Sequence, residues 1–271
     1  MDVFTINEET CNQCGACASV CHFGLIEFQK KSYPQPVSVA EMCSRCAACM
    51  AVCPTQSIVL RDVSYEQCPP INPAYNVSHE QLVQVIKSRR SVRSYRARKV
   101  PRDLIETIIE TVRYSPTGNN AQNVNWLVFD GKSELQYFRN VGFDWVLEVA
   151  KHLSLPPAWV ELLRERRETR NEDFFLRGAP LVVSTYAEHG DAVNAASCVI
   201  ALAYFDLIAA SLGLGCCWNG LFSGAANSFP PVKERVRLPE GFEVHGSLMV
   251  GYPKYKYNRI PPRKPAQITW R

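Results

Sequence analysis

Hydrophobic and polar positions beyond residue 78 repeat with two different spacings. Apolar residues three or four positions apart, such as Leu82, Val85 and Ile86, indicate one face of a helix, whereas short apolar runs between glycine and proline indicate buried strands. The spacing predicts helices over residues 78–88, 101–115 and 192–212, a helical region over 134–170 that is interrupted at Pro156-Pro157, and strands over 125–130, 180–187 and 245–251. Helices and short strands that interleave in this way predict an α+β fold or an α/β sandwich.

The first sixty residues follow a cysteine pattern instead. Two groups of four cysteines have the spacing C-x2-C-x2-C-x3-C, which is the signature of bacterial ferredoxins with two 4Fe-4S clusters. Three thiolates on one loop can bind three irons of a cubane, and the fourth cysteine of each group binds the other cluster. We therefore assign Cys11, Cys14, Cys17 and Cys53 to one cluster and Cys43, Cys46, Cys49 and Cys21 to the other.

The two cysteine groups also form an internal repeat with an offset of 32 residues. Residues 9–28 match residues 41–60, and His22 stands where the second copy has Pro54. A repeat this short predicts two half-domains that are each too small to bury a core, so that the clusters stabilise the fold. Zinc is disfavoured because structural zinc sites usually have two cysteine pairs with a longer spacer, and disulfides are disfavoured by the same spacing.

Length and composition are those of a globular protein with one large domain or two smaller ones. The chain has 271 residues and 12 cysteines, and its start, Met1-Asp2-Val3, lacks the basic charge and the long apolar run of a signal peptide. We therefore expect a reducing, cytoplasmic environment. Residues 195–215 are hydrophobic enough to suggest a membrane span, but Asp206 lies among them, so a buried helix and no membrane association are expected.

Charge is distributed unevenly along the chain. The net charge of +4 is too small and too scattered to predict nucleic-acid binding. The basic excess lies beyond residue 62, so we expect an anionic cofactor or substrate there. A proline-rich stretch around Cys68-Pro69-Pro70 has the composition of a semi-rigid linker. These observations predict a two-cluster ferredoxin domain over residues 1–62, a linker over 63–78 and a second domain over 79–271.

Four blocks of the second domain have the residue types of a cofactor site. They are, in order, Arg89-Arg90-Ser91-Val92-Arg93, the amide-rich loop 115–122, the glycine-rich segment 213–220, and Gly251-Tyr252-Pro253 followed by Arg263. A basic cluster by itself is most often a solvated helix end. Its combination with a loop of small residues and with glycines that let backbone approach a flat ligand indicates a binding site instead.

These blocks resemble, in the same order, those of the nitroreductase-like flavoprotein superfamily over roughly residues 79–271. The resemblance implies a nitroreductase-like α/β sandwich that binds FMN at the interface of a homodimer, with helix 192–212 between the subunits. It implies that Arg89, Arg263 and Ser91 bind the phosphate, that Arg90 lies at the ribityl or phosphate end, and that Arg93 lies near the pyrimidine edge. It further implies that Pro116, Thr117, Gly118 and Asn120 come from the partner chain, and that backbone groups of Trp218, Asn219 and Gly220 face the flavin edge that includes N5.

The fusion with a ferredoxin domain leads to a functional hypothesis. We expect single electrons from ferredoxin or another low-potential carrier to pass through the clusters to FMN and then to a small organic acceptor such as a nitroaromatic, a quinone or an activated alkene. No Gly-x-Gly-x-x-Gly follows a predicted strand, so no separate nicotinamide-binding domain is expected. Two alternatives stay open: a carrier that exchanges electrons between soluble proteins, and an NAD(P)H-driven nitroreductase whose clusters are structural or sensing.

Overall fold

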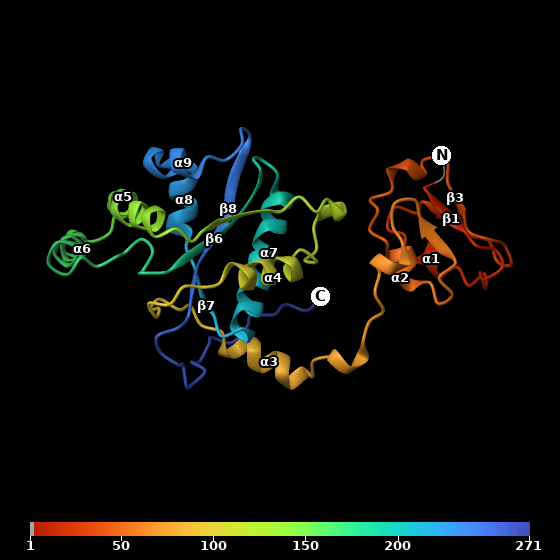
Figure 1. Cartoon of the computed structure of the whole chain (residues 1–271), viewed down its shortest axis with the longest axis horizontal. Coiled ribbons are helices and arrows are strands. Elements are labelled where there is room, and N and C mark those ends of the chain that lie inside the picture. Colours follow the sequence, from red (N-terminus) through yellow and green to blue (C-terminus); the bar gives the residue numbers. More distant parts are fainter. Residues whose placement is uncertain (1–2) are drawn as a thin grey trace. The chain divides into compact units, whose positions relative to one another are not determined.

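The computed structural model describes residues 3–271, which divide into two compact units (Figure 1). One unit contains residues up to Asn76 together with Asn119–Ala121, and the other contains Val77–Gly118 and Gln122–Arg271. Met1 and Asp2, which belong to the predicted ferredoxin domain, lie outside the described residues.

The first unit is built from short elements around the cysteines. Its strands and helices are β1 (Phe4–Ile6), α1 (Ala16–Ser19), β2 (Ile26–Glu27), β3 (Gln35–Pro36), the 3-10 turn η1 (Ala40–Met42), α2 (Ala48–Val52), β4 (Ile58–Leu60), and the 3-10 turns η2 (Tyr65–Gln67) and η3 (Pro73–Tyr75). Strand β1 pairs antiparallel with β4, and β2 pairs antiparallel with β3. Phe4, Met50 and Ile58 lie in a small core together with the buried cysteines Cys17 and Cys49.

The repeat of 32 residues is also present in the backbone of this unit. Helix α2 begins 32 residues after α1, and left-handed residues recur with the same offset. Positive φ angles occur at Gln13 and Arg45 (53° and 53°), at Gly15 and Ala47 (72° and 55°), and at Gly24 and Gln56 (64° and 55°). Such conformations are uncommon outside glycine, so their recurrence shows that both copies wrap the chain in the same way around their cysteines.

The second unit contains one four-stranded antiparallel sheet with the strand order β5-β6-β8-β7. Its elements are α3 (His79–Ser88), α4 (Arg102–Val112), β5 (Asn125–Phe129), α5 (Lys132–His152), α6 (Pro157–Arg170), β6 (Leu181–Glu188), α7 (Ala192–Ser211), β7 (Gly215–Trp218), α8 (Gly220–Ser228), α9 (Pro230–Val236) and β8 (Phe242–Gly251). The predicted helices and strands are present, whereas β7, α8 and α9 have no counterpart among the elements expected from the sequence.

Helices cover both faces of this sheet (Figure 1). On β6, Leu181 and Val183 pack toward α4 and α7, while Val182 between them packs toward α5, α8 and α9. Successive strand residues point to opposite faces, so a continuous apolar run fills two cores at once. The architecture is therefore the α+β sandwich expected from the sequence.

Helix α7 is long and apolar enough to cross a membrane by length and composition, and it is the single such helix among the described residues. Cys198, Leu202 and Phe205 of this helix are fully buried in the core between α7, α4 and the sheet. Asp206 is also buried. This helix is therefore the core helix of the second unit, in agreement with the buried helix expected from Asp206.

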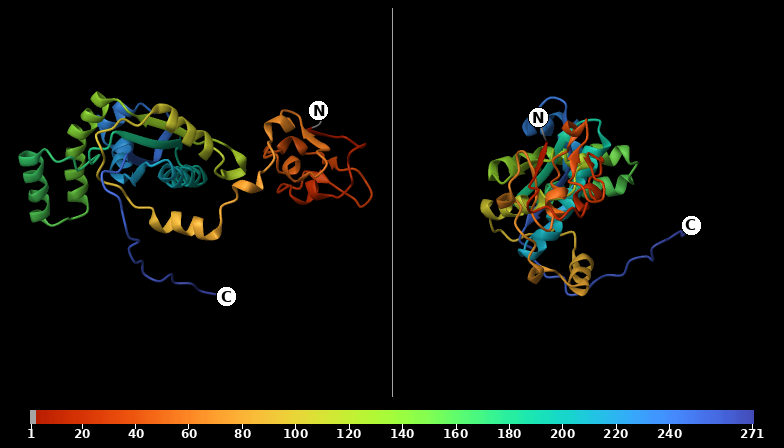
Figure 2. Two further views of the ribbon diagram at one scale, coloured as in Figure 1. Left: turned by 60° about the horizontal axis from the view of Figure 1, so that its bottom comes forward. Right: turned by 90° about the vertical axis from the view of Figure 1, so that its right-hand side faces the viewer.

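Helix α3 and the C-terminal tail contrast with this core. Helix α3 has no buried residue, and its apolar residues Leu82, Val85 and Ile86 are exposed by 49%, 38% and 55%. Residues 254–271 are exposed throughout and extend away from the second unit (Figure 2). An amphipathic helix is normally stabilised by packing of its apolar face, so α3 has a face that this chain does not cover.

Candidate functional sites

The cysteines of the first unit lie on two equivalent frameworks of loop and helix. Cys17 lies on α1 and Cys49 on α2. Beyond each helix, a backbone amide donates a hydrogen bond to the fourth cysteine of the group: Leu25 N to Cys21 Sγ and Ser57 N to Cys53 Sγ, both at 3.3 Å. Amides that point at sulfur stabilise a thiolate, which is the form that binds iron.

The two predicted ligand sets are each brought together. Cys21, Cys43, Cys46 and Cys49 line one cavity, which is otherwise mostly apolar. For the other set, burial raises the pKa of the Cys17 thiol, and the nearby sulfurs of Cys53 and Cys14 raise it further. Cys21 thus lies with Cys43, Cys46 and Cys49, and Cys53 lies near Cys17 and Cys14, while the place of Cys11 in the second set stays a prediction.

The donor chemistry of both sets fits iron–sulfur clusters. Burial raises the pKa of Cys49 to about 11, and the sulfurs of Cys43 and Cys46 add to this effect. Iron takes the place of the proton in such a site. Among residues 3–271, no three His, Cys, Asp or Glu side chains lie close enough to hold one metal ion. Sulfurs around a cubane lie farther apart because each binds a different iron, so the arrangement suits clusters better than zinc.

Cys53 has additional donors that Cys21 does not share. The Thr55 hydroxyl lies 3.7 Å from Cys53 Sγ. Burial raises the pKa of Cys53, but hydrogen bonds from Ser57 and Thr55 outweigh it, and the pKa of this thiol is lowered. The neighbouring phenol of Tyr65 has a pKa raised to about 12, first by burial and then by Cys53. Tyr65 donates a hydrogen bond to Ile58 O at 3.1 Å, so it stays a neutral donor beside this cysteine.

In the second unit, three of the four predicted blocks meet at strand β7. The amide of Val92 donates to Cys216 O at 2.9 Å, and the amide of Arg96 donates to Tyr252 O at 2.8 Å. Gly215 is required there, because a Cβ atom on it would lie 2.5 Å from Cγ2 of Val92. The arginine block is therefore held along the edge of β7 and beside the turn that follows β8.

Arg89 forms an ion pair with Asp206 of α7, at 3.2 Å between Nη1 and Oδ2. The carboxylate side chain is 5% exposed and the guanidinium side chain 26% exposed. Burial raises the pKa of Asp206, against the opposing effects of Arg89 and of hydrogen bonds that involve Trp218 and Cys216. This pair was not predicted, although the sequence indicates it: a lone carboxylate within an apolar helix requires a buried cation or hydrogen-bond donor.

A basic cavity of about 580 Å³ opens beside this ion pair. It is lined by the cationic side chains Arg89, Arg90, Arg96, Arg98 and Lys256, by Tyr252, Tyr255 and Tyr257, and by residues of β7 and of the α7 C-terminus. One buried carboxylate, Asp206, lies among these cations. The balance of charge favours an anionic group such as a phosphate, to which guanidinium groups bind in a bidentate manner.

Ser91 and Arg93, the other predicted ligands of the arginine block, lie near Cys217 of β7. Burial raises the pKa of Cys217, and the charge of Arg93 and a hydrogen bond from Ser91 oppose this shift. Ser91 and Arg93 are therefore separated from Arg89 by the edge of β7. Cys216 and Cys217 are 2% and 3% exposed, as expected for packing residues.

The N-terminus of α8 provides part of the predicted flavin edge. The amide of Asn219 donates to Ser247 O at 2.8 Å, and its side-chain oxygen caps the helix by accepting from Phe222 N at 3.0 Å. Asn219 is therefore occupied by the protein itself. The amide of Gly220 lies at the first helical position, where the helix supplies no acceptor, so it is a donor of this turn that can reach a ligand.

Comparison with known proteins identifies both parts of the chain. Residues 86–252 match the model of the nitroreductase family. The chain belongs to this family. Residues 10–64 match the 4Fe-4S dicluster domain, so both resemblances inferred from the sequence are confirmed.

Several relatives cover most of the nitroreductase domain. A 4-nitrobenzoate reductase from Nocardioides sp. (strain LMS-CY) is 26% identical over 208 residues, which are 64% of this chain and 81% of that protein. The nitroreductase with bound FMN from Bacteroides fragilis NCTC 9343 is 23% identical, with a TM-score of 0.57 over 70% of this chain and 98% of its own. A nitroreductase with bound FMN from Desulfitobacterium hafniense DCB-2 is 21% identical, with a TM-score of 0.54 over 69% and 96%. The structural matches establish the fold of this domain.

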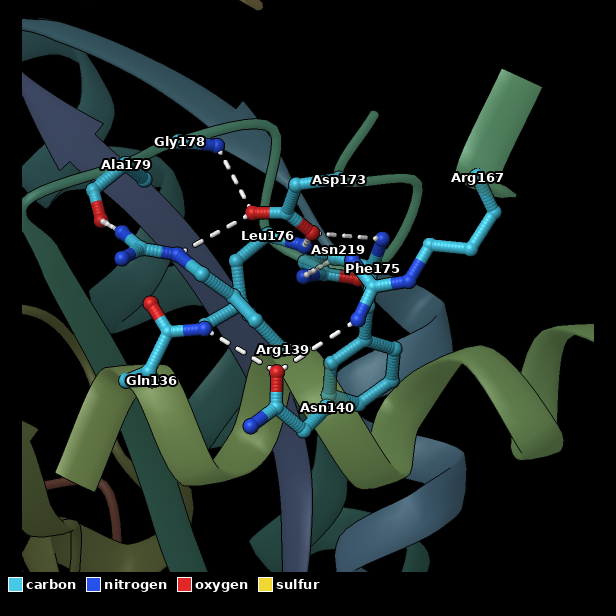
Figure 3. A network of polar contacts seen from close by, with 10 residues as sticks. All are labelled: Gln136, Arg139, Asn140, Arg167, Asp173, Phe175, Leu176, Gly178, Ala179 and Asn219. Carbon is cyan, nitrogen blue, oxygen red and sulfur yellow. Dashed lines mark hydrogen bonds and ion pairs between the residues drawn. The ribbon is translucent and has the colours of Figure 1, made fainter. Parts of the chain in front are cut away.

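A polar network fixes the α8 N-terminus of the nitroreductase domain (Figure 3). The carboxylate of Asp173 accepts hydrogen bonds from the amides of Phe175, Leu176 and Gly178 at 3.0, 2.8 and 2.8 Å, and from Arg139 at 3.1 Å. The side-chain amide of Asn219 then donates to Phe175 O at 2.9 Å. One carboxylate thus shapes the turn that holds Asn219, and with it the position of the Gly220 amide.

The predicted partner-chain loop lies at the other end of α7 from the arginine block. Gly118 packs against Val193, and Asn123 donates to Asn194 at 2.5 Å, whereas Arg89 contacts Asp206. Twelve residues of helix separate Asn194 from Asp206, or about 18 Å.

The structure therefore does not join Pro116, Thr117 and Gly118 to Arg89 within one chain. Thr117 accepts from Gln122 N at 3.0 Å within the loop. Asn120 belongs to the short segment grouped with the first unit. Arg263 lies on the exposed tail, apart from the arginine block. The ligand roles of these residues stay predictions.

We expect Asp173→Asn to destabilise the nitroreductase domain by about 2 to 3 kcal/mol, because an amide cannot accept all four hydrogen bonds and leaves buried donors unpaired. Urea unfolding followed by tryptophan fluorescence measures this change. Asp144→Asn replaces an exposed carboxylate on α5 and should change the stability by less than about 0.5 kcal/mol. Equal effects of the two substitutions would contradict the role given to Asp173.

Proposed function

We propose that this nitroreductase-family oxidoreductase binds FMN in its second domain and uses electrons from its two 4Fe-4S clusters to reduce a small organic acceptor. The observation that carries the proposal is the presence, in one chain, of two cubane ligand sets and of a nitroreductase domain with a basic cavity. When bound, FMN converts one-electron input into two-electron output. The ferredoxin domain supplies electrons singly, which matches that input.

The residues of the basic cavity and those on the other side of the β7 edge suit different parts of FMN. Arg89 and Arg90 bind the phosphate, and Asp206 holds the Arg89 guanidinium in place by its ion pair. Arg93 lies near the pyrimidine edge, where its charge stabilises negative charge on the ring. The Gly220 amide faces the edge of the ring, in a position set by the capped α8 helix. The chain thus supplies binding and orientation, while the cofactor supplies the redox chemistry.

The acceptor class follows from the relatives. The Nocardioides relative is named a 4-nitrobenzoate reductase, which supports a nitroaromatic or a similarly electron-poor organic acceptor. Quinones and activated alkenes accept electrons in the same way and belong to the proposed class. Fold similarity supports this class and not one compound.

Arg90→Ala, which leaves the Arg89–Asp206 ion pair intact, should weaken FMN binding by roughly 10- to 100-fold and leave riboflavin binding nearly unchanged, because the lost charge-assisted hydrogen bonds go to the phosphate. Titration of the flavin-free protein with each compound, followed by flavin fluorescence, measures both affinities. Arg113→Ala, which changes an exposed arginine on α4, should affect neither. An equal loss of FMN and riboflavin affinity would contradict the phosphate role.

The direction of electron input has its own test. Under anaerobic conditions, a reduced ferredoxin should bleach the flavin of the whole protein rapidly, whereas NADH should bleach it slowly. Stopped-flow absorbance with each donor measures the two rates. Cys46→Ser, at an exposed cluster ligand, should slow the reaction with ferredoxin, while Cys68→Ser, outside both ligand sets, should not. Rapid bleaching by NADH, with the clusters still oxidised, would contradict this route and favour structural or sensing clusters.

We propose that the active form is a homodimer with FMN at the interface. Two features of the chain support it: the loop at Gly118 and the arginine block are at opposite ends of α7, and the apolar face of α3 is uncovered. A second copy that packs antiparallel along α7 would place the loop of one chain beside the arginines of the other. The C-terminal tail of the second copy can then bring Arg263 to the same phosphate.

Ile86→Glu should therefore convert the dimer into a monomer without unfolding it, since more than half of the Ile86 side chain is exposed in the single chain. Light scattering after size-exclusion chromatography should give twice the chain mass of 30.5 kDa for the unmodified protein and a smaller value for the variant. Gln84→Glu, on the polar side of the same helix, is the matched control. A wild-type protein that is monomeric at all concentrations would contradict the proposal.

A further inference from the structure

The two halves of the ferredoxin domain differ in the surroundings of their crossed cysteines. Cys21 and Cys53 occupy equivalent positions, and each accepts one backbone hydrogen bond of 3.3 Å from the residue four positions later. The side chains at the equivalent positions are different. Phe23 and Leu25 follow Cys21, whereas Thr55 and Ser57 follow Cys53.

The hydroxyls near Cys53 form a continuous chain. Thr55 Oγ1 lies 3.7 Å from Cys53 Sγ and 2.7 Å from Ser57 Oγ, and Ser57 Oγ lies 2.9 Å from Thr10 Oγ1. Ser57 is 1% exposed, so its hydroxyl takes its partners from the protein. Since a thiolate can only accept, Thr55 donates to Cys53 and Ser57 donates to Thr55, and Ser57 then accepts from Thr10, whose hydroxyl is shared with Asn7 O at 3.4 Å. Hydrogen bonds in such a chain polarise one another.

The surroundings of Cys21 are apolar by comparison. Cys21 lies in the cavity that it shares with Cys43, Cys46 and Cys49, whose walls are mostly apolar, with Phe23, Leu25, Ile26, Ala40 and Leu60, and also include the polar residues His22 and Ser44. Apolar walls provide no dipoles that could stabilise additional negative charge on a cluster. The two ligand sets thus share one backbone and differ in the polarity around the fourth ligand.

From this difference we infer that the two clusters have unequal reduction potentials, with the cluster of Cys11, Cys14, Cys17 and Cys53 the higher, and that Thr55 and Ser57 set the difference. Reduction adds one negative charge to a cluster, and hydrogen bonds to its ligand sulfurs stabilise that charge. At the fourth ligand, the Thr55 hydroxyl occupies the position where the other repeat has Phe23, so it raises the potential of its own cluster alone. Thr55 and Ser57 act here as positioning and tuning residues that do not touch iron.

One hydrogen-bond donor belongs to the other cluster and would raise the potential of that cluster instead. The amide of Arg45 donates to Cys43 Sγ at 3.4 Å, on the cluster of the apolar cavity. The charge of Arg45 is paired with Asp62 at 2.9 Å, and both side chains are more than half exposed, so solvent and the carboxylate screen it. A single backbone amide is weaker than the polarised hydroxyl chain together with Tyr65, which also lies beside Cys53.

A redox titration of the whole protein, followed by EPR, tests the inference. The wild-type protein should show two cluster potentials, and Thr55→Val, which keeps the side-chain shape without the hydroxyl, should lower the higher potential and leave the lower one in place. Thr55→Ser retains the donor and should restore the wild-type value. Phe23→Thr places a hydroxyl at the equivalent position near Cys21 and should raise the lower potential.

Several outcomes would overturn the inference. They are an unchanged pair of potentials in Thr55→Val, an equal shift of both clusters, or a shift of the lower potential. Iron content and the visible absorption of each variant show whether both clusters are assembled before the titration. The readout depends only on the ferredoxin domain, so its result is independent of FMN binding and of the organic acceptor.

Discussion

The ion pair of Arg89 and Asp206 is the interaction on which the arrangement of the second domain depends. A carboxylate inside the core is costly unless a cation accompanies it, and Arg89 is the cation that contacts it. The pair joins the central helix α7 to the end of α3, where the arginine block begins. Because Val92 is also bonded to β7, the block is fixed from two sides, with Arg89 and Arg90 lining the basic cavity and Arg93 on the side of Cys217. Removal of either partner would leave an uncompensated charge near the centre of the fold.

The ferredoxin domain achieves order by different means. Its apolar core is small, and its loops take left-handed conformations at six matched positions, which a chain of this size would not hold by packing alone. Backbone amides that point at sulfur give each ligand loop a defined shape around its cluster. The chain thus combines a domain stabilised by its cofactors with a domain stabilised by a packed sheet.

The sequence was informative where chemistry repeats or where periodicity is long. Cysteine spacing alone predicted the dicluster domain that the family comparison confirms, and the apolar pattern predicted α7 and β6. The sequence did not predict β7, because Gly215, Cys216 and Cys217 form too short a run to distinguish strand from loop. Helices α8 and α9 are also short, with glycine and proline near their starts. The partner of Asp206 depends on a contact between residues 117 positions apart, which periodicity does not reveal.

The separation of the Gly118 loop from the arginine block along α7 has a consequence for how the protein behaves on dilution. In the proposed homodimer, the flavin site is assembled from two chains and exists only while they are associated, so cofactor binding and self-association strengthen each other by mass action. Dilution should then release flavin, and excess flavin should hold the chains together. Each cluster is bound within one chain, so its oxidation state does not depend on this linkage between flavin binding and association of the chains. The amount of protein in the cell therefore sets how much of it carries both kinds of cofactor at once.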